Sequence, residues 1–182
     1  RLKGNLKIKF PYSRPYIDSK DITSVKNVLE RGYLTQGEKL VSFENLLKKT
    51  FKSKYALACN SGTAALHMIY MALNVGPNRA VLTSPITFLA TANAAKMCKA
   101  KVYFSDVNKD SGCMDPDSAE EVLKKHPDIS VIAVVHLCGR IANMEALSIL
   151  AKKYNCKIVE DACHAPGSYF KNKRGKNVHT GS

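Results

Sequence analysis

Hydrophobic and polar residues follow one another along this chain with two different periods. Near the N-terminus, apolar side chains three and four positions apart predict helices over residues 19–31 and 38–51. Asp18 is suited to cap the first helix, and Gly32 is suited to end it. The stretch "YLTQG" between the two helices is expected to form a loop.

Short apolar runs alternate with helical stripes over the rest of the chain. The expected strands are "YALAC" (55–59), "AVLTS" (80–84), "KVYFSDV" (101–107), "ISVIAVVHL" (129–137) and "KIVEDA" (157–162). The helices expected between them cover residues 60–76, 88–99, 115–126 and 143–155. A hairpin around Arg174 and Gly175 is expected over residues 168–178.

This order of elements predicts an α/β fold, a three-layer αβα sandwich with a mostly parallel sheet. The run over residues 129–137 is typical of a strand that is covered on both faces. No linker or internal repeat divides residues 1–182, so we expect a single domain. Ligands of such sheets bind at the carboxyl ends of the strands, where this chain places many of its polar residues.

Composition narrows the possible functions. No apolar run reaches the roughly 20 residues of a membrane span, and the N-terminus lacks the continuous apolar segment of a secretory signal. The six cysteines include no CxxC pair, which is typical of reduced thiols and predicts a cytoplasmic protein. The net charge of +13 suits anionic partners, either nucleic acid or small anions such as nucleotides. No RNA-binding or helix-turn-helix signature accompanies it, so solvated helix ends are the simpler explanation, and we expect neither a nucleic-acid partner nor a membrane.

Two stretches that follow expected strands carry candidate ligand-binding residues. In "CNSGTAAL", Gly62 and Thr63 stand where a helix begins, and free N–H groups there bind phosphate. The alternative is an ordinary N-cap, in which Ser61 or Thr63 satisfies the free amides. In "SPITFLATANA", Phe88 is placed either to stack on a flat ligand or to join the core.

The stretch "VEDACHAPG" (159–167) puts Asp161 and His164 at the end of another expected strand. A buried carboxylate needs a partner. A carboxylate that faces a protonated ring nitrogen keeps that nitrogen charged, as pyridoxal phosphate requires to act as an electron sink. His164 is suited to bond the phenolic oxygen of the same ring. Phosphate site, stacking ring and carboxylate at successive strand ends therefore predict pyridoxal 5'-phosphate as the cofactor.

The chain resembles the N-terminal part of the DegT/DnrJ/EryC/StrS aminotransferases, which are pyridoxal-phosphate enzymes that act on nucleotide-linked sugars. The matching stretches include "GYLTQGEKLVSFE", "ALACNSGTAALHM", "TSPITFLATANAAKMCKAKVYFSDV" and "IVEDACHAPGSYF". The resemblance implies the large domain of the fold type I (aspartate aminotransferase-like) enzymes. The wording "TFLATANA" and "EDACHAPG" is most similar to family members of the pseudaminic-acid pathway, which aminate C4 of a UDP-linked 4-keto-6-deoxy-N-acetylhexosamine.

The resemblance implies roles for five cofactor-binding residues. Gly62 and Thr63 would hold the phosphate, Phe88 would stack on the pyridine ring, and Asp161 would pair with the ring nitrogen. His164 stands where many relatives carry glutamine, and it would contact the phenolic oxygen.

The resemblance also implies a substrate and an assembly. Thr35 and Gln36 would line the substrate entrance, whereas His136 and Gly139 belong to a strand-end motif with a mostly structural role. The amino group would pass from L-glutamate to a nucleotide-linked keto sugar, in an enzyme that works as a homodimer.

One expected residue is missing from the sequence. The family's Schiff-base lysine lies in a segment of the type S-F-x-x-x-K, which should follow the hairpin. The candidates Lys157, Lys171, Lys173 and Lys176 do not lie in that context. We therefore expect the catalytic lysine and the small C-terminal domain beyond Ser182, and we expect this chain, an incomplete large domain, to be inactive alone.

Two alternatives stay open at this point. Some relatives replace the lysine by histidine and dehydrate sugars with pyridoxamine phosphate, and the deciding position would again lie beyond Ser182. A non-enzymatic module that binds zinc or anions is the second alternative. In the zinc variant, His136, Cys138, Cys163 and His164 would converge from two strand ends.

Overall fold

The computed structural model describes residues 14–172 and 175–181 and contains two compact units. The first unit comprises Arg1–Ser42 and the second Phe43–Ser182. Arg174 of the expected hairpin lies outside the described residues. Assignment of the whole chain to one domain stays a prediction.

The first unit is built on α1 (Ser19–Arg31), which leads through a loop to α2 (Glu38–Phe51), the helix in which the first unit ends. Both helices were predicted. Asp18 caps α1 by accepting hydrogen bonds from two backbone amides, and Asp21 bonds back to the Asp18 amide to complete a capping box. Gly32 ends the helix in the left-handed region at φ 74°, which glycine adopts without strain.

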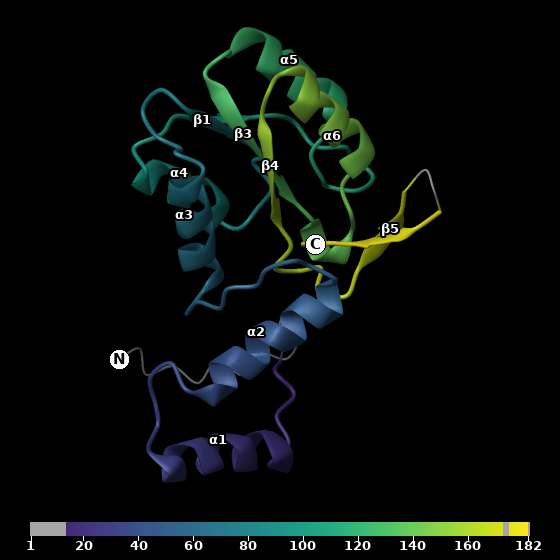
Figure 1. Ribbon diagram of the computed structural model, residues 1–182. Helices are drawn as coiled ribbons and strands as arrows, with labels where there is room; N and C mark the ends of the chain where they lie inside the picture. The colour runs from purple at the N-terminus through teal and green to yellow at the C-terminus, as the bar shows by residue number, and fades with distance from the viewer. Residues whose placement is uncertain (1–13, 173–174, 182) are drawn as a thin grey trace, which may run out of the picture. The chain divides into compact units, whose positions relative to one another are not determined.

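The second unit contains the parallel sheet (Figure 1). Its strands are β1 (Ala80–Thr83), β2 (Val102–Phe104), β3 (Ile129–Val135) and β4 (Lys157–Asp161). They run in the order β2-β1-β3-β4, and every neighbouring pair is parallel. The predicted α/β class is therefore confirmed.

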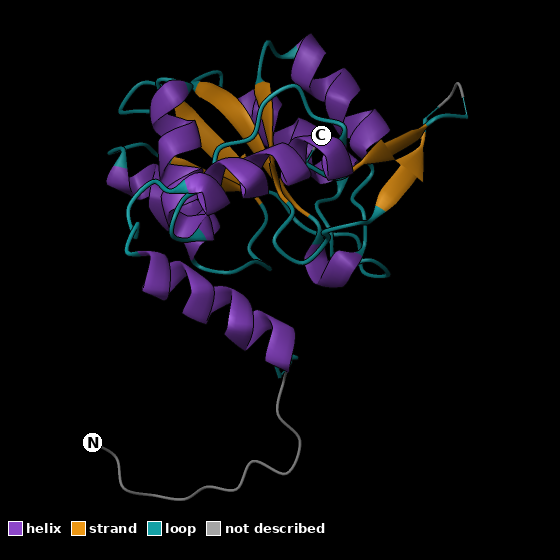
Figure 2. Cartoon of the chain, turned by 60° about the horizontal axis from the view of Figure 1, so that its bottom comes forward, coloured by secondary structure: helices purple, strands orange, loops and turns teal. Residues whose placement is uncertain are grey.

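Helices cover both faces of this sheet (Figures 1 and 2). One side carries α3 (Gly62–Ala72) and α4 (Ala90–Met97), and the other carries α5 (Pro116–Lys125) and α6 (Met144–Lys153). The central strand β3 alternates between the two cores, because Val131 and Ala133 pack with α3 and α4 while Ile132 and Val134 pack on the opposite side. The prediction of a strand covered on both faces is thereby confirmed.

The C-terminal hairpin was also predicted. It pairs β5 (Tyr169–Lys171) with β6 (Asn177–His179) in antiparallel fashion. A short 3-10 turn, η1 (Leu137–Gly139), follows β3 and leads toward α6. Across the residues that the structure describes, no helix is long and apolar enough to cross a membrane.

The strand predicted over residues 55–59 is wrong. This segment is irregular and open to solvent, with Tyr55 and Leu57 each about three-quarters exposed (76% and 75%). The amide of Ala58 bonds to the Glu44 carboxylate at 2.9 Å instead of to a neighbouring strand. An apolar run indicates a buried strand only where another strand accepts its hydrogen bonds, and periodicity contains no information about that partner.

Candidate functional site

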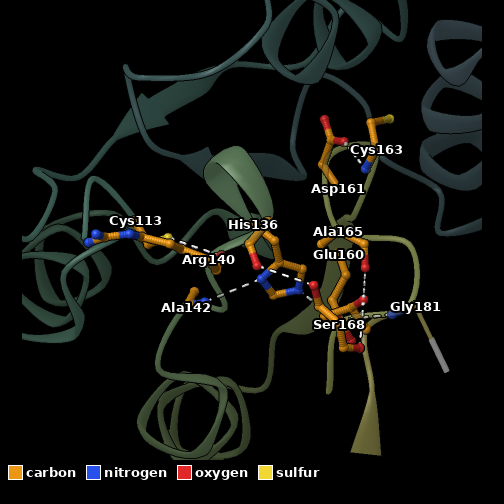
Figure 3. Close-up of polar contacts among 12 residues, drawn as sticks. Cys113, His136, Arg140, Ala142, Glu160, Asp161, Cys163, Ala165, Ser168 and Gly181 are labelled. Carbon is orange, nitrogen blue, oxygen red and sulfur yellow. Dashed lines mark hydrogen bonds and ion pairs between the residues drawn. The ribbon is translucent and has the colours of Figure 1, made fainter. Parts of the chain in front are cut away.

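The candidate site lies at the carboxyl edge of the sheet, where β4 ends in Asp161. This carboxylate is only 8% exposed. Its Oδ1 accepts a hydrogen bond from the Cys163 amide at 3.3 Å (Figure 3). Its Oδ2 accepts one from the Thr91 hydroxyl at 2.7 Å. No salt bridge to Asp161 occurs within the described part of the chain. Because a buried carboxylate is stabilised by a positive charge and these donors are neutral, Asp161 is suited to bind a cationic ligand atom.

The N-terminus of α3 supplies the second part of the site. Ser61 caps the helix, since its hydroxyl accepts a hydrogen bond from the Ala64 amide at 3.2 Å, so the N-cap interpretation holds for Ser61. The amides of Gly62 and Thr63 donate no hydrogen bond to any residue that the structure describes. Capping by Ser61 therefore leaves two N–H groups and the positive end of the helix dipole for an anion.

The Cys163 side chain connects these two parts. A Cβ atom added at Gly62 would lie 3.1 Å from the Cys163 sulfur, so the start of α3 approaches the loop after β4 closely. The backbone amide of the same cysteine bonds to Asp161. Burial raises the pKa of the Cys163 thiol to about 11, and a hydrogen bond and negative charge from Asp161 contribute to the rise. The thiol is therefore uncharged at neutral pH.

Phe88 follows β1 and is 73% exposed, so the alternative of a core aromatic is wrong for this residue. It lines a cavity of about 510 Å³ together with Thr63, Lys96 and Met97. Two of the predicted cofactor residues, Thr63 and Phe88, thus share one hollow. Asp161, Gly62 and His164 are not among the residues that line it.

His164 is exposed, and its Nδ1 accepts a hydrogen bond from the Cys138 amide at 3.4 Å. The neighbouring turn depends on Gly139, which has φ 82° and would place a Cβ atom 3.2 Å from the His164 carbonyl oxygen. The structural role expected for Gly139 agrees with this geometry, because it lets the β3 turn pack against the backbone of His164.

The His136 side chain is fully buried, and its ring makes contacts away from the Asp161 carboxylate (Figure 3), whereas its backbone amide donates to the Asp161 carbonyl oxygen at 3.1 Å. Its Nε2 lies 2.8 Å from Glu160 Oε2, and its Nδ1 accepts a hydrogen bond from the Ala142 amide at 3.3 Å. Both ring nitrogens are used, and no group of three His, Cys, Asp or Glu side chains that could hold a metal gathers among the described residues. The convergence required for the zinc alternative is not found.

Thr91 and Tyr70 are neighbours of the site that were not predicted from the sequence. The Tyr70 hydroxyl donates to the Thr91 carbonyl at 3.0 Å, and both residues are fully buried. Burial, and then the nearby charge of Asp161, raises the pKa of the Tyr70 hydroxyl well above its ordinary value, so it remains a donor. The available signal was the spacing of Thr87 and Thr91, which places two hydroxyls on one face of a helical turn.

The predicted substrate residues Thr35 and Gln36 belong to the first compact unit, in the loop between α1 and α2. Gln36 adopts φ 50° and lines a cavity of about 750 Å³ whose other walls include Tyr33 and Leu40. Their role in substrate binding stays a prediction.

The chain as a whole is similar to known aminotransferases. The DegT/DnrJ/EryC1/StrS aminotransferase family matches residues 15–181. A UDP-4-amino-4,6-dideoxy-N-acetyl-beta-L-altrosamine transaminase of Campylobacter jejuni is 40% identical over 163 residues, which are 90% of this chain.

Two solved structures have a similar fold. Helicobacter pylori PseC, an aminotransferase involved in the biosynthesis of pseudoaminic acid, superposes with TM-score 0.82 at 32% identity, covering 90% of this chain and 44% of PseC. The PLP form of the Streptococcus pneumoniae sugar aminotransferase Spr1654 superposes with TM-score 0.82 at 28% identity, covering 90% of this chain and 45% of that one. The chain spans 43% of the length of the Campylobacter relative.

Proposed function

The chain belongs to the DegT/DnrJ/EryC1/StrS aminotransferase family, and we propose that it forms the cofactor-binding region of an enzyme that transfers an amino group to a nucleotide-linked keto sugar. The cofactor is pyridoxal 5'-phosphate, which when bound supplies an electron sink for the bonds next to the transferred nitrogen. The amino donor is L-glutamate. The observation that carries the proposal is Asp161, a buried carboxylate at the carboxyl end of a parallel strand, whose hydrogen-bond donors among the described residues are neutral.

The residues present fit this cofactor. Asp161 holds a proton on the pyridine nitrogen, since a carboxylate at that position stabilises the charged ring. The free amides of Gly62 and Thr63 bind the phosphate at the positive end of α3. The exposed ring of Phe88 stacks on the pyridine face, and His164 bonds the phenolic oxygen. These residues come from the ends of three elements that contact one another through Cys163 and Thr91.

The substrate is a UDP-linked 4-keto-6-deoxy-N-acetylhexosamine that is aminated at C4. Two relatives support this assignment: the Campylobacter transaminase of a UDP-linked amino sugar, and Helicobacter PseC with its part in pseudoaminic acid biosynthesis. Thr35 and Gln36 contact the sugar nucleotide. The same two relatives favour transamination over the dehydratase alternative, because one is a transaminase and the other an aminotransferase.

The enzyme works as a cytoplasmic homodimer. Exposed apolar side chains on and beside α3 and α4 support a second copy of the chain as a partner: Met68, Met71, Leu89 and Met97. The free state of all six cysteines supports a reducing compartment. Sedimentation of the purified chain tests the dimer, and a monomer at every concentration would contradict it.

The test of the proposal is a titration of the purified chain with pyridoxal phosphate, followed by absorbance and then by borohydride trapping. We expect saturable binding that Asp161→Asn abolishes and that Asp117→Asn, at an exposed acid in α5, leaves intact. Absence of a trapped lysine adduct would mean that none of the lysines present forms the Schiff base. Binding that survives Asp161→Asn, or no binding at all, would contradict the proposed cofactor site.

A further inference from the structure

The Asp161 carboxylate is held by a chain of hydroxyl groups that the cofactor roles do not use. Thr91 Oγ1 lies 2.7 Å from Asp161 Oδ2, and Thr87 Oγ1 lies 2.9 Å from Thr91 Oγ1. Thr91 is fully buried, whereas Thr87 is half-buried. The three side chains therefore form a continuous series of hydrogen bonds from the turn after β1 to the end of β4.

The direction of these hydrogen bonds follows from counting hydrogens. A threonine hydroxyl has one hydrogen to donate, and an ionised carboxylate has none. Thr91 must give its hydrogen to Asp161, so the bond between the two threonines must be donated by Thr87. A hydroxyl that accepts one bond is a stronger donor in the next, which favours the order Thr87 to Thr91 to Asp161.

The backbone that carries Thr91 is also fixed. Its carbonyl accepts a hydrogen bond from the buried Tyr70 hydroxyl at 3.0 Å, and its amide donates to the Phe88 carbonyl at 3.2 Å. The Thr91 backbone is thus held by Tyr70 of α3 and by Phe88, the residue proposed to stack on the cofactor. The side chain cannot turn away from Asp161 without leaving a buried polar group unsatisfied.

We propose that Thr91, supported by Thr87 and Tyr70, is a positioning residue that fixes the plane of the Asp161 carboxylate toward a protonated ring nitrogen. This inference rests on the proposed function, because it takes Asp161 as the partner of the pyridine nitrogen. Thr91 binds Oδ2 and the Cys163 amide binds Oδ1, so the carboxylate is held from both oxygens. The lone pairs that remain on these oxygens are then fixed in direction before the ligand arrives.

The test compares two ligands that differ only in the ring nitrogen. Pyridoxal phosphate and its 1-deaza analogue, in which carbon replaces that nitrogen, are titrated into the wild-type chain, Thr91→Val, Thr91→Ser and Thr87→Val. The ratio of affinities for pyridoxal phosphate over its 1-deaza analogue should fall roughly tenfold in Thr91→Val. The reason is that the charge-assisted contact between Asp161 and the ring nitrogen loses its orientation. Thr91→Ser should restore most of the preference, and Thr87→Val should cause a smaller loss in the same direction.

The control is Thr83→Val. Thr83 is an equally buried threonine, and its hydroxyl bonds to the Ala133 carbonyl rather than to Asp161. This substitution should not change the preference between the two ligands. If Thr91→Val weakens both ligands equally, or leaves the preference unchanged, the positioning role is wrong.

The two proposals fail in different ways. If Asp161→Asn does not alter pyridoxal phosphate binding, the cofactor site itself is refuted. If Asp161→Asn removes the preference for pyridoxal phosphate over the 1-deaza analogue and Thr91→Val does not, only the role of Thr91 is refuted. Should Thr91→Val not fold, Thr91→Ser and Thr87→Val decide alone, and an unchanged preference in Thr87→Val would overturn the positioning role of the hydroxyl chain.

Discussion

The imidazole of His136 and the carboxylate of Glu160 form a hydrogen bond of 2.8 Å between the ends of two neighbouring strands. His136 Nδ1 accepts from the Ala142 amide, so that nitrogen carries no hydrogen and the other, Nε2, must donate to Glu160. The same Glu160 oxygen accepts a bond from the Gly181 amide at 3.2 Å. The pair therefore ties β3, β4 and the C-terminal turn together behind the candidate site.

Glu160→Ala should lower the free energy of unfolding by about 1–3 kcal/mol, because it leaves the buried Nε2–H of His136 without an acceptor. Glu160→Gln retains an acceptor oxygen and should cost clearly less. Chemical denaturation of the three proteins measures the difference. Equal losses for alanine and glutamine would show that the hydrogen bond to His136 is not what Glu160 contributes.

Cys163 should react slowly with iodoacetamide although its side chain is accessible. Its pKa of about 11 lowers the thiolate fraction at pH 8 on the order of 100-fold relative to a free cysteine. Since Asp161 contributes to that shift, Asp161→Asn should speed the alkylation of Cys163. Peptide mass spectrometry over a time course gives the rate at this residue, with N-acetylcysteine as reference. A rate equal to the reference in the wild-type chain would contradict the raised pKa.

The order of elements could be predicted because local chemistry determines it. Asp115 followed by Pro116 begins α5 as expected, with the Asp115 carboxylate accepting a bond from the Ser118 amide at 2.9 Å. The apolar run of β3 was recognised because both of its faces are covered. Such signals lie within a few residues of one another and need no knowledge of the tertiary structure.

The parts of the site that were missed depend on contacts between distant residues. Thr91 and Asp161 are 70 positions apart, and nothing in either local pattern pairs them. The resemblance supplied Asp161 itself, but its Thr91 donor comes into place only once α4 is packed on the sheet. The failed strand over residues 55–59 has the same origin, since its apolar pattern was visible and the absence of a pairing strand was not.

Glu120 should make stability depend on pH at the junction of α5 and α6. Its pKa is lowered mainly by a hydrogen bond from Lys153, then by one from Tyr154. A lowered folded-state pKa contributes stability above the ordinary value of 4.5, and this stability is lost as the pH falls through the lower folded-state value.

The difference in melting temperature between wild type and Glu120→Gln should therefore be present at pH 7 and vanish in acid. Because Lys153 is exposed and Glu120 is only half-buried, added salt should also reduce the difference. Glu121→Gln, at the next and exposed position of α5, is the matched control and should show neither dependence. A difference that stays constant between pH 7 and pH 3 would refute the ion pair as its cause.

Leu147 should be among the most sensitive positions in the core. It is fully buried in the cluster between α5, α6 and the sheet. Leu147→Ala should cost about 2–5 kcal/mol of unfolding free energy through lost burial and a residual cavity. Ile149 is on the same helix and 56% exposed, so Ile149→Ala should cost far less. Similar losses for both variants would mean that α6 does not pack on the sheet through Leu147.

A glycine at position 62 allows the close approach of the Cys163 sulfur, and it also leaves the backbone bare for an anion. A double-mutant cycle separates these two reasons. In Gly62→Ala the new Cβ atom would lie 3.1 Å from the Cys163 sulfur, which offsets the gain of up to about 1 kcal/mol that alanine gives a helix. Cys163→Ala removes the sulfur and keeps the amide that bonds to Asp161. Gly62→Ala should then be more stabilising in the Cys163→Ala background, with a coupling energy of roughly 0.5–1 kcal/mol by denaturation.

Pyridoxal phosphate affinity in the same four proteins tests the second reason. If the anion also needs a bare backbone at Gly62, Gly62→Ala should weaken binding in both backgrounds, including the one where the sulfur is gone. Weaker binding only in the presence of Cys163 would mean that the glycine serves the approach of α3 to the loop after β4. The phosphate would then be held by the amide of Thr63 and the helix dipole without any steric demand on Gly62.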